Sequence, residues 1–404
     1  MADTNLSSVA GALKRVYDKN VSRLQNLEAR AMNEIVKSSK NYSPGGEGFF
    51  GDVNDYGNES VGAINEEEQF RTIDSEDYQQ WKVTPKIMVA PIQFSGLVSK
   101  AAEGDDESFV NVVMDAMERA RDRLIKDENR QFYGLGNGFI CAPAGNVASN
   151  LTSFTVTSTQ YIRQNMVLDV TLSSSLVATA LRVSYVDKVN NIVGFSTSVG
   201  AALTSSASLV KQNILNSAPA DGKEMMGLQG ICDDGTNLTT FENISAATNY
   251  LWRGRRIDAS GANLTSDLLQ RIIDDVAILS GENVDTLIMH RQQRRKYLDI
   301  VVPQKRYAEQ KMDAGFQKLE FNGIELWLDV DCQNNTVYAF AKKLLEKFEL
   351  AALEVGTHDG SDKFLRMANF DLYQSYWRHY VNLGTGKRNG FGMITGLATP
   401  AGVS

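Results

Sequence analysis

The chain has 404 residues, of which 43% are hydrophobic and 22% are charged, and its formal net charge is −8 at pH 7. A chain of this length can bury a large core, and this composition excludes an intrinsically disordered protein. The acidic balance argues against a general nucleic-acid binder, which we expect to be basic, although it is compatible with a local basic patch.

The cysteines and the N-terminus indicate the compartment. Cys141, Cys232 and Cys332 are far apart and form neither a CxxC pair nor a metal-ligand spacing. Reduced thiols in a cytosolic compartment therefore fit better than a disulfide framework. The N-terminus lacks a basic segment followed by an apolar run, so we expect no secretory signal. Two uncharged stretches, 131–162 and 189–210, are too rich in Ser, Thr, Asn and Gly to span a membrane.

The first predicted element is an amphipathic helix. Apolar residues recur at spacings near three and four between Leu13 and Ile35, and Asp3, Thr4 and Ser7 can cap its start. A single apolar stripe has to pack on another surface. Two interpretations stay open: the helix packs on the core of its own chain, or it is an arm that reaches onto a neighbouring subunit.

Residues 43–80 are rich in glycine and acidic residues and show little apolar periodicity. We expect a long extended loop or hairpin, and a loop of this length inside a compact domain indicates a function. The run Glu66, Glu67 and Glu68 is either a solvated loop face or a group that pairs with arginines on another chain.

A strand and a long helix follow. Residues 83–94 are strand-like, and Pro85 and Pro91 restrict this strand to an edge or an irregular position. The helix is predicted over Glu107–Tyr133, about 40 Å at 1.5 Å per residue, and Gly134 is a natural stop. Apolar residues form one face, and we expect the charged residues to fill the others: Arg119, Arg121, Asp122, Arg123, Lys126, Asp127 and Glu128.

The composition changes between residues 131 and 220, where charged residues become sparse. Short segments rich in Val, Thr and aromatic residues, bounded by Asn, Gly and Ser, predict a small β unit. These segments are Ser153–Val156, Met166–Val170, Leu181–Val186 and Asn191–Phe195. We therefore expect an inserted β-domain near residues 150–213.

From Leu228 onward the pattern predicts alternating helices and strands. The expected elements are a helix from Leu268 to Leu279 that ends at Gly281, a buried strand at Thr286–Met289, a basic helix at Arg291–Val301, and a hairpin at Leu319–Trp327. The Asn322-Gly323 pair of this hairpin fits a type I′ turn. The aromatic segment Tyr373–Leu383 alternates as a strand does.

Catalytic patterns are scarce. None of the three histidines belongs to a metal-binding motif, and a structural role is favoured for His290. Asp329 and Asp331 form a DxD pair that could hold Mg²⁺, but no further ligand can be nominated, so strand-end solvation or a hydrogen bond to a turn is favoured. We therefore predict no catalytic residue, no cofactor and no metal site.

Two basic clusters lie at residues 252–256 and 290–297. For each cluster three interpretations stay open: a solvated surface, ion pairing between subunits, or direct contact with phosphate, for which the aromatic interleaving is slight. The candidate intersubunit contacts are Glu66, Glu67, Glu68, Arg253, Arg255, Arg256, Arg291, Arg294 and Arg295.

The order of these parts resembles the major capsid protein of tailed bacteriophages, the Hong Kong 97 type fold, over nearly the whole chain. The resemblance rests on the arm at Lys14–Ser39, the loop at Gly45–Ser99, the long helix at Asp105–Tyr133, the segments GLQGICDD and VDTLIMHRQQRRKYLD, the LEFNGIELWLD hairpin, and the terminal YWRHYVNLGTGKRNGFGMITGL. The β-rich insert is the departure from the pattern. No residue can be assigned to covalent crosslinking.

The resemblance implies an α+β fold with five parts. They are an N-terminal arm helix at 1–44, an extended loop at 45–100, a peripheral domain with a spine helix at 101–137, an axial domain at 138–345 that carries the β-domain at 150–213, and peripheral return strands at 346–404.

The resemblance also implies a structural function, self-assembly into the icosahedral head shell that encloses double-stranded DNA. The implied partners are copies of the chain in hexamers and pentamers, scaffolding, portal or decoration proteins, and packaged DNA through weak contacts, with no membrane. The implied location is the virion, after assembly in the host cytoplasm. The alternatives are an encapsulin-type nanocompartment shell and, from another class, an enzyme with an acidic metal site at Asp329 and Asp331.

Overall fold

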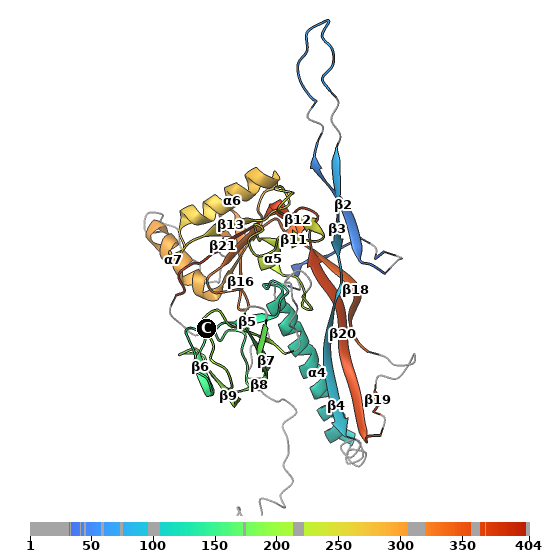
Figure 1. Ribbon diagram of the computed structural model, residues 1–404, viewed down its shortest axis with the longest axis vertical. Coiled ribbons are helices and arrows are strands. Elements are labelled where there is room, and N and C mark those ends of the chain that lie inside the picture. Colours follow the sequence, from blue (N-terminus) through green and yellow to red (C-terminus); the bar gives the residue numbers. More distant parts are fainter. Residues whose placement is uncertain are drawn as a thin grey trace, which may run out of the picture.

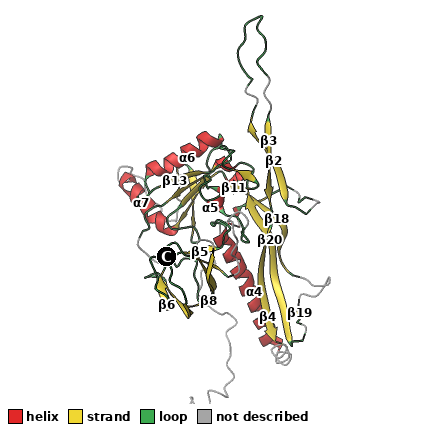
Figure 2. Cartoon of the chain, viewed as in Figure 1, coloured by secondary structure: helices red, strands yellow, loops and turns green. Residues whose placement is uncertain are grey.

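The computed structural model describes residues 32, 34–40, 42–43, 46–57, 60–72, 76–95, 106–172, 175–212, 222–305, 320–356, 364–367 and 369–400. Three hydrophobic cores hold this α+β chain together. Figure 1 shows a long, narrow unit, a rounder unit beside it, and a hairpin whose outer end extends beyond both. Nearly all the helical structure lies in one long helix and in the rounder unit (Figure 2).

The long unit, here called the peripheral unit, is a sheet with one helix. Its strands are β1 (Val36–Lys37), β18 (Glu346–Val355), β20 (Leu372–Gly384) and β19 (Leu365–Arg366), and β4 (Lys86–Ser95) pairs with β20. Helix α4 (Asp106–Gln131) packs along β4. Among the described strands β4 has only β20 as a neighbour, so the edge position predicted from Pro85 and Pro91 is confirmed.

The predicted loop at 43–80 contains a two-stranded hairpin, β2 (Phe49–Tyr56) and β3 (Asp77–Val83). Its base belongs to the main core, where the rings of Phe49 and Trp81 lie 5.2 Å and 5.7 Å from the ring of Phe348. The rest of the hairpin extends beyond the body of the molecule (Figure 1). The core thus anchors the base of the hairpin and leaves its outer end outside the body of the molecule.

The rounder unit, here called the axial unit, has a six-stranded sheet in the order β13-β21-β17-β14-β16-β15. The strands are Arg255–Asp258, Phe391–Thr395, Val337–Phe340, Thr286–His290, Ile324–Asp329 and Glu320–Phe321. Helix α6 (Ser266–Ser280) begins at the N-cap Thr265 and ends at Gly281, whose φ is 68°. Helix α7 (Arg291–Lys305) follows β14 directly. Asn322 and Gly323 both have positive φ, as the predicted type I′ turn requires.

Two short connections complete this part of the chain. Helix α5 (Leu228–Ile231) and the pair β11 (Thr240–Phe241) and β12 (Ile244–Ser245) belong to the main core. Short 3₁₀ turns cover Lys342–Leu344 and Arg388–Gly390. Within the part of the chain that the structure describes, no helix is long and apolar enough to cross a membrane.

The third unit, here called the insert, is a six-stranded sheet with its own core, in the order β5-β10-β7-β8-β9-β6. Its strands are Phe139–Cys141, Ser208–Lys211, Val167–Leu172, Ser175–Asp187, Ile192–Val199 and Leu151–Thr155. The sheet starts at Phe139 and not near residue 150, the expected start, because β5 pairs with β10.

The predicted N-terminal helix falls almost entirely on residues 1–31, which lie outside the described residues. Met32 and Ile35, near its expected end, are buried in the main core, and β1 runs parallel to β18. The segment that follows the predicted helix therefore packs on its own chain. The cysteines are all free and buried.

Candidate functional site

The outer part of the hairpin, residues 60–72, is here called the hairpin tip. It turns at Glu66 and Glu67, where the backbone N–H of Glu68 donates to the carbonyl of Asn65 at 3.1 Å. The carboxylate of Glu68 in turn accepts from the Asn65 N–H at 3.0 Å. Every residue from 61 to 72 is exposed, so the three predicted glutamates stand on an open surface.

The hairpin tip also carries apolar side chains in solvent. Val61 is 85% exposed and Phe70 is 84% exposed, and Ile64 is exposed as well. A single exposed apolar residue is ordinary, but several at the end of a projecting hairpin are not. The tip therefore presents three exposed apolar side chains beside a negative run.

The first basic cluster contacts its own chain. The Nε of Arg255 lies 2.7 Å from a carboxylate oxygen of Asp275. Arg253 donates from Nε to the carbonyl of Ala246 at 2.7 Å, and Arg256 donates to the hydroxyl of Thr395 at 3.3 Å. All three are half-buried. These side chains tie β13 and the residues before it to α6, to β21 and to the segment after β12, and their predicted intersubunit role stays a prediction.

The second cluster forms the first turns of α7. Arg291 and Arg295 are exposed, whereas Arg294 is half-buried. His290, the last residue of β14, is buried, and its Nδ1 accepts from the backbone N–H of Gln292 at 3.1 Å. Burial lowers the pKa of His290 to about 4, so this ring is neutral at pH 7. The structural role predicted for His290 agrees with this geometry.

The last two turns of α4 hold a polar network that sequence reasoning missed. We call residues 126–131 and their partners the junction network, because they connect α4 to every other unit. Lys126 and Glu128 belong to the charged faces that the sequence predicts for this helix, and the structure buries both. Helical periodicity does not show that elements distant in the sequence cover this end of α4.

Toward the axial unit, the junction network ends in two carboxylates. The Nζ of Lys126 lies 2.7 Å from Oδ2 of Asp331. The side-chain amide of Asn129 donates to Asp331 at 2.7 Å and to both oxygens of Asp329 at 3.2 Å. Burial raises the pKa of Asp331, and the ammonium of Lys126 opposes that rise. Both carboxylates are buried, so the predicted strand-end solvation is wrong. The backbone N–H of Asp331 donates to Oδ1 of Asp329 at 2.8 Å, which agrees with the predicted hydrogen bond to a turn.

The same finding bears on the metal-site hypothesis. Within the described ranges, no group of three or more His, Cys, Asp or Glu side chains is arranged to hold a metal ion. Asp329 and Asp331 already face an ammonium and an amide donor. A cation at this position would have to displace Lys126, whose charge it would meet at close range.

Toward the insert, Asp127 is the central group of the junction network. It pairs with Arg130 at 3.1 Å and with Lys211 of β10 at 2.6 Å. Burial raises the pKa of Asp127, but the two cations outweigh it and hold the pKa well below its usual range. Arg130 also pairs with the buried Glu224, and the side chain of Gln131 accepts from the backbone N–H of Met225 at 2.9 Å.

Toward the peripheral sheet, His379 of β20 lies between two carboxylates. Its Nδ1 is 2.8 Å from Glu128 of α4 and its Nε2 is 2.8 Å from Glu349 of β18. Lys37 of β1 reaches Glu349 at 3.0 Å. Burial lowers the pKa of His379, but its hydrogen bonds and charge interactions with the two glutamates outweigh burial and raise it overall.

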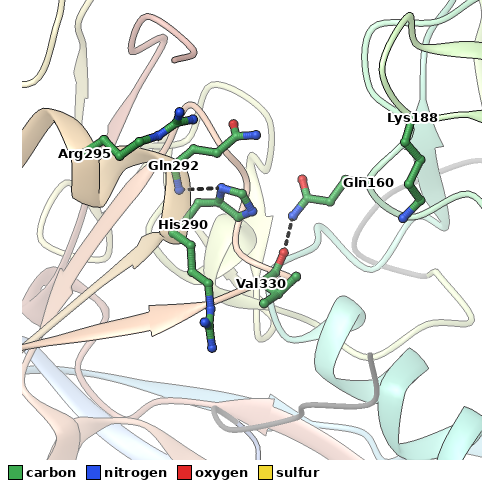
Figure 3. Close-up of a pocket in the computed structure, with 7 residues that line it drawn as sticks. Gln160, Lys188, His290, Gln292, Arg295 and Val330 are labelled. Carbon is green, nitrogen blue, oxygen red and sulfur yellow. Dashed lines mark hydrogen bonds between the residues drawn. The ribbon is translucent and has the colours of Figure 1, made fainter. Parts of the chain in front are cut away.

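One pocket, of about 310 Å³, lies between the insert and the axial unit. Its lining residues are Gln160, Lys188, His290, Arg291, Gln292, Arg295 and Val330. Figure 3 shows Lys188 and Arg295 on opposite sides of the group, with His290 and Gln160 between them. Gln160 donates to the carbonyls of Val330 and Cys332 at 2.7 Å and 2.6 Å, which joins the two units at the pocket.

Known proteins resemble this chain in structure and not in sequence. No known family model matches the sequence, and no curated protein matches it. Many solved structures are similar to this chain, and three capsids among them match it over almost its whole length. The capsid of cyanophage A-1(L) has a TM-score of 0.58 at 10% identity and covers 96% of this chain and 98% of its own.

The other two are also capsids. The capsid of a native GTA particle has a TM-score of 0.51 at 9% identity, covering 98% of this chain and 99% of its own. The capsid of Myoviridae phage XM1 has a TM-score of 0.50 at 9% identity, covering 96% and 98%. At such identities the likeness concerns the fold alone.

Proposed function

We propose that this chain, which has the Hong Kong 97 type fold of tailed-phage major capsid proteins, builds the icosahedral shell of a phage head. The observation that carries the proposal is the hairpin tip. It stands outside the body, is fully exposed from residue 61 to 72, and presents Val61 and Phe70 to solvent. A partner that covers this surface would stabilise the apolar side chains, and a second copy of the chain supplies such a partner in every subunit of a shell.

In this proposal the shell forms through repeated contacts between subunits. Each subunit would place its hairpin tip on a neighbour, and each contact would recur around the shell. The base of the hairpin is fixed by Phe49 and Trp81 in the main core, so a force applied at the tip reaches the peripheral sheet. We propose that Glu66, Glu67 and Glu68 pair with cations of that neighbour, and that the copies associate as pentamers and hexamers.

Further partners belong to the same proposal. Scaffolding, portal or decoration proteins would act during assembly in the host cytoplasm, and packaged double-stranded DNA would make weak contacts with the inner surface. The acidic balance of the chain, −8 overall, supports weak DNA contacts because counterions have to neutralise both surfaces.

The experiment is expression of the full chain, followed by sedimentation and negative-stain microscopy. We expect closed shells of uniform size, and a chain that stays monomeric at every concentration would contradict the proposal. The content of shells from infected cells separates the alternatives, because nuclease-resistant DNA supports a phage head, whereas a packaged protein supports an encapsulin. Metal-dependent turnover by the purified subunit would support the enzyme.

A further inference from the structure

The pocket between the insert and the axial unit has a chemistry that shell formation does not require. Of its seven lining residues, Lys188, Arg291 and Arg295 are cationic and none is acidic. All three cations are exposed to solvent, so a ligand can reach them. They come from two units: Lys188 follows β8 of the insert, and the two arginines belong to α7 of the axial unit.

The fold brings these groups to one edge of the axial sheet. Strands β14 and β16 are parallel, with His290 paired to Asp329, so both strands end beside the pocket. Crevices beyond the carboxyl ends of parallel strands are common ligand sites. Helix α7 starts at the same edge, and its first turn adds the positive end of the helix dipole to the charge of the arginines.

The walls of the pocket are held in place. Tyr161, next to Gln160, donates to the carbonyl of Asp331 at 2.6 Å, beside the two hydrogen bonds that Gln160 makes to this segment. The nearby carboxylates Asp329 and Asp331 bond to Lys126 and Asn129 of α4. The backbone segment that carries Val330 is therefore held against the insert without a ligand.

Two further cations act on Lys188. Partial desolvation and the positive charges of Arg163 and Lys126 lower the pKa of Lys188, and the carboxylate of Asp331 opposes this shift. An anion in the pocket would reduce the repulsion among these cations.

We propose that this pocket binds a phosphate group, which Lys188 of the insert and Arg291 and Arg295 of α7 hold from opposite sides. Arginine favours phosphate because its planar guanidinium donates two parallel hydrogen bonds, and lysine adds a point charge. The phosphate comes either from a free polyphosphate or from a nucleic-acid backbone. In both cases the ligand bridges the insert and the axial unit and fixes their relative orientation.

The test measures binding of pyrophosphate to the full-length chain by titration calorimetry, in wild type and in two pairs of variants. Lys188→Met and Arg295→Met remove pocket cations. Arg182→Met and Arg271→Met remove exposed cations of the same two units outside the pocket. We expect one pyrophosphate per chain, with affinity about tenfold weaker in each pocket variant and unchanged in each control.

Competition separates the two sources of phosphate. Displacement of pyrophosphate by a short DNA duplex at constant salt would identify the backbone as the ligand, and lack of displacement would identify a free phosphate compound. Three results would overturn the proposal: wild type that does not bind pyrophosphate at millimolar concentration, equal losses in pocket and control variants, or tighter binding of a glutamate-rich peptide than of pyrophosphate through the same residues.

Discussion

The ammonium of Lys126 lies 2.7 Å from the carboxylate of Asp331, and both side chains are buried. This ion pair joins the long helix α4 to the strand end of the axial unit. Within two helical turns the same helix reaches the insert through Asp127 and the peripheral sheet through Glu128. The three units therefore share one polar connection, and several predictions about its strength and about the hairpin tip can be tested.

Removal of the buried cation should destabilise the subunit. Lys126→Met leaves Asp331 buried without a cation, with the Asn129 amide as its remaining donor, and breaking a buried ion pair costs about 3–5 kcal/mol. Urea unfolding of the unassembled subunit measures the loss. Arg121→Met is the matched control on the same helix, since its pair with Asp122 is partly exposed and should contribute less than about 1 kcal/mol. Equal losses in the two variants would contradict the role assigned to Lys126.

His379 should make the stability of the subunit depend on pH. Its pKa is raised in the folded chain, so its contribution is fully present below the unfolded value of about 6.5 and is lost as the pH rises through the folded value. His379→Gln should therefore cost more free energy of unfolding at pH 5.5 than at pH 9. Denaturant titration at the two pH values checks this, and a larger cost at pH 9 would reverse the sign and refute it.

The glutamates of the hairpin tip should affect assembly and leave the fold intact. Glu66, Glu67 and Glu68 are all exposed, so their replacement by lysine should preserve the circular dichroism spectrum of the subunit while particle yield by sedimentation falls. A triple Glu→Gln variant is the matched control, because it removes the negative charge without adding a positive one and should give an intermediate yield. Normal yield of the lysine variant at moderate salt would show that this charge has no role.

The apolar side chains of the tip should behave in the same way for a different reason. Phe70→Ala and Val61→Ala should leave subunit stability within about 0.5 kcal/mol, because both side chains are exposed in the single chain. If a neighbouring subunit buries these two side chains, each variant should lose about 1.5–3 kcal/mol of association free energy per contact. The critical concentration for shell formation measures that loss. Val189→Ala, at an exposed position of the insert, should leave it unchanged.

The insert should be removable at the boundaries that the sheet defines. The backbone N–H of Lys211 donates to the carbonyl of Gly138 at 3.1 Å, so the two ends of residues 139–211 lie side by side and a short glycine-serine bridge can join them. We expect this deletion to give a soluble subunit. Deletion of 151–211 should aggregate, because it leaves β5 without β10. Aggregation of both deletion variants would contradict this prediction and would show that the main fold depends on the insert.

The sequence alone determined the local elements and their order. Apolar periodicity, the stop at Gly281 and the Asn322-Gly323 turn predicted α6 and the β15–β16 hairpin correctly, because those signals act within a few residues. The composition of residues 43–80 predicted a long extended loop or hairpin, and the structure forms a hairpin there. The ordered sequence of parts was enough to name the capsid fold.

Only the tertiary structure decided which polar residues are buried together. Lys126, Asp127 and Glu128 look like the solvated side of an amphipathic helix, yet their partners Asp331, Lys211 and His379 come from three distant segments. The start of the insert at Phe139 likewise depends on pairing with β10. Periodicity reports on one element at a time, whereas burial of charge depends on where other elements meet it, and that information is spread over the whole chain.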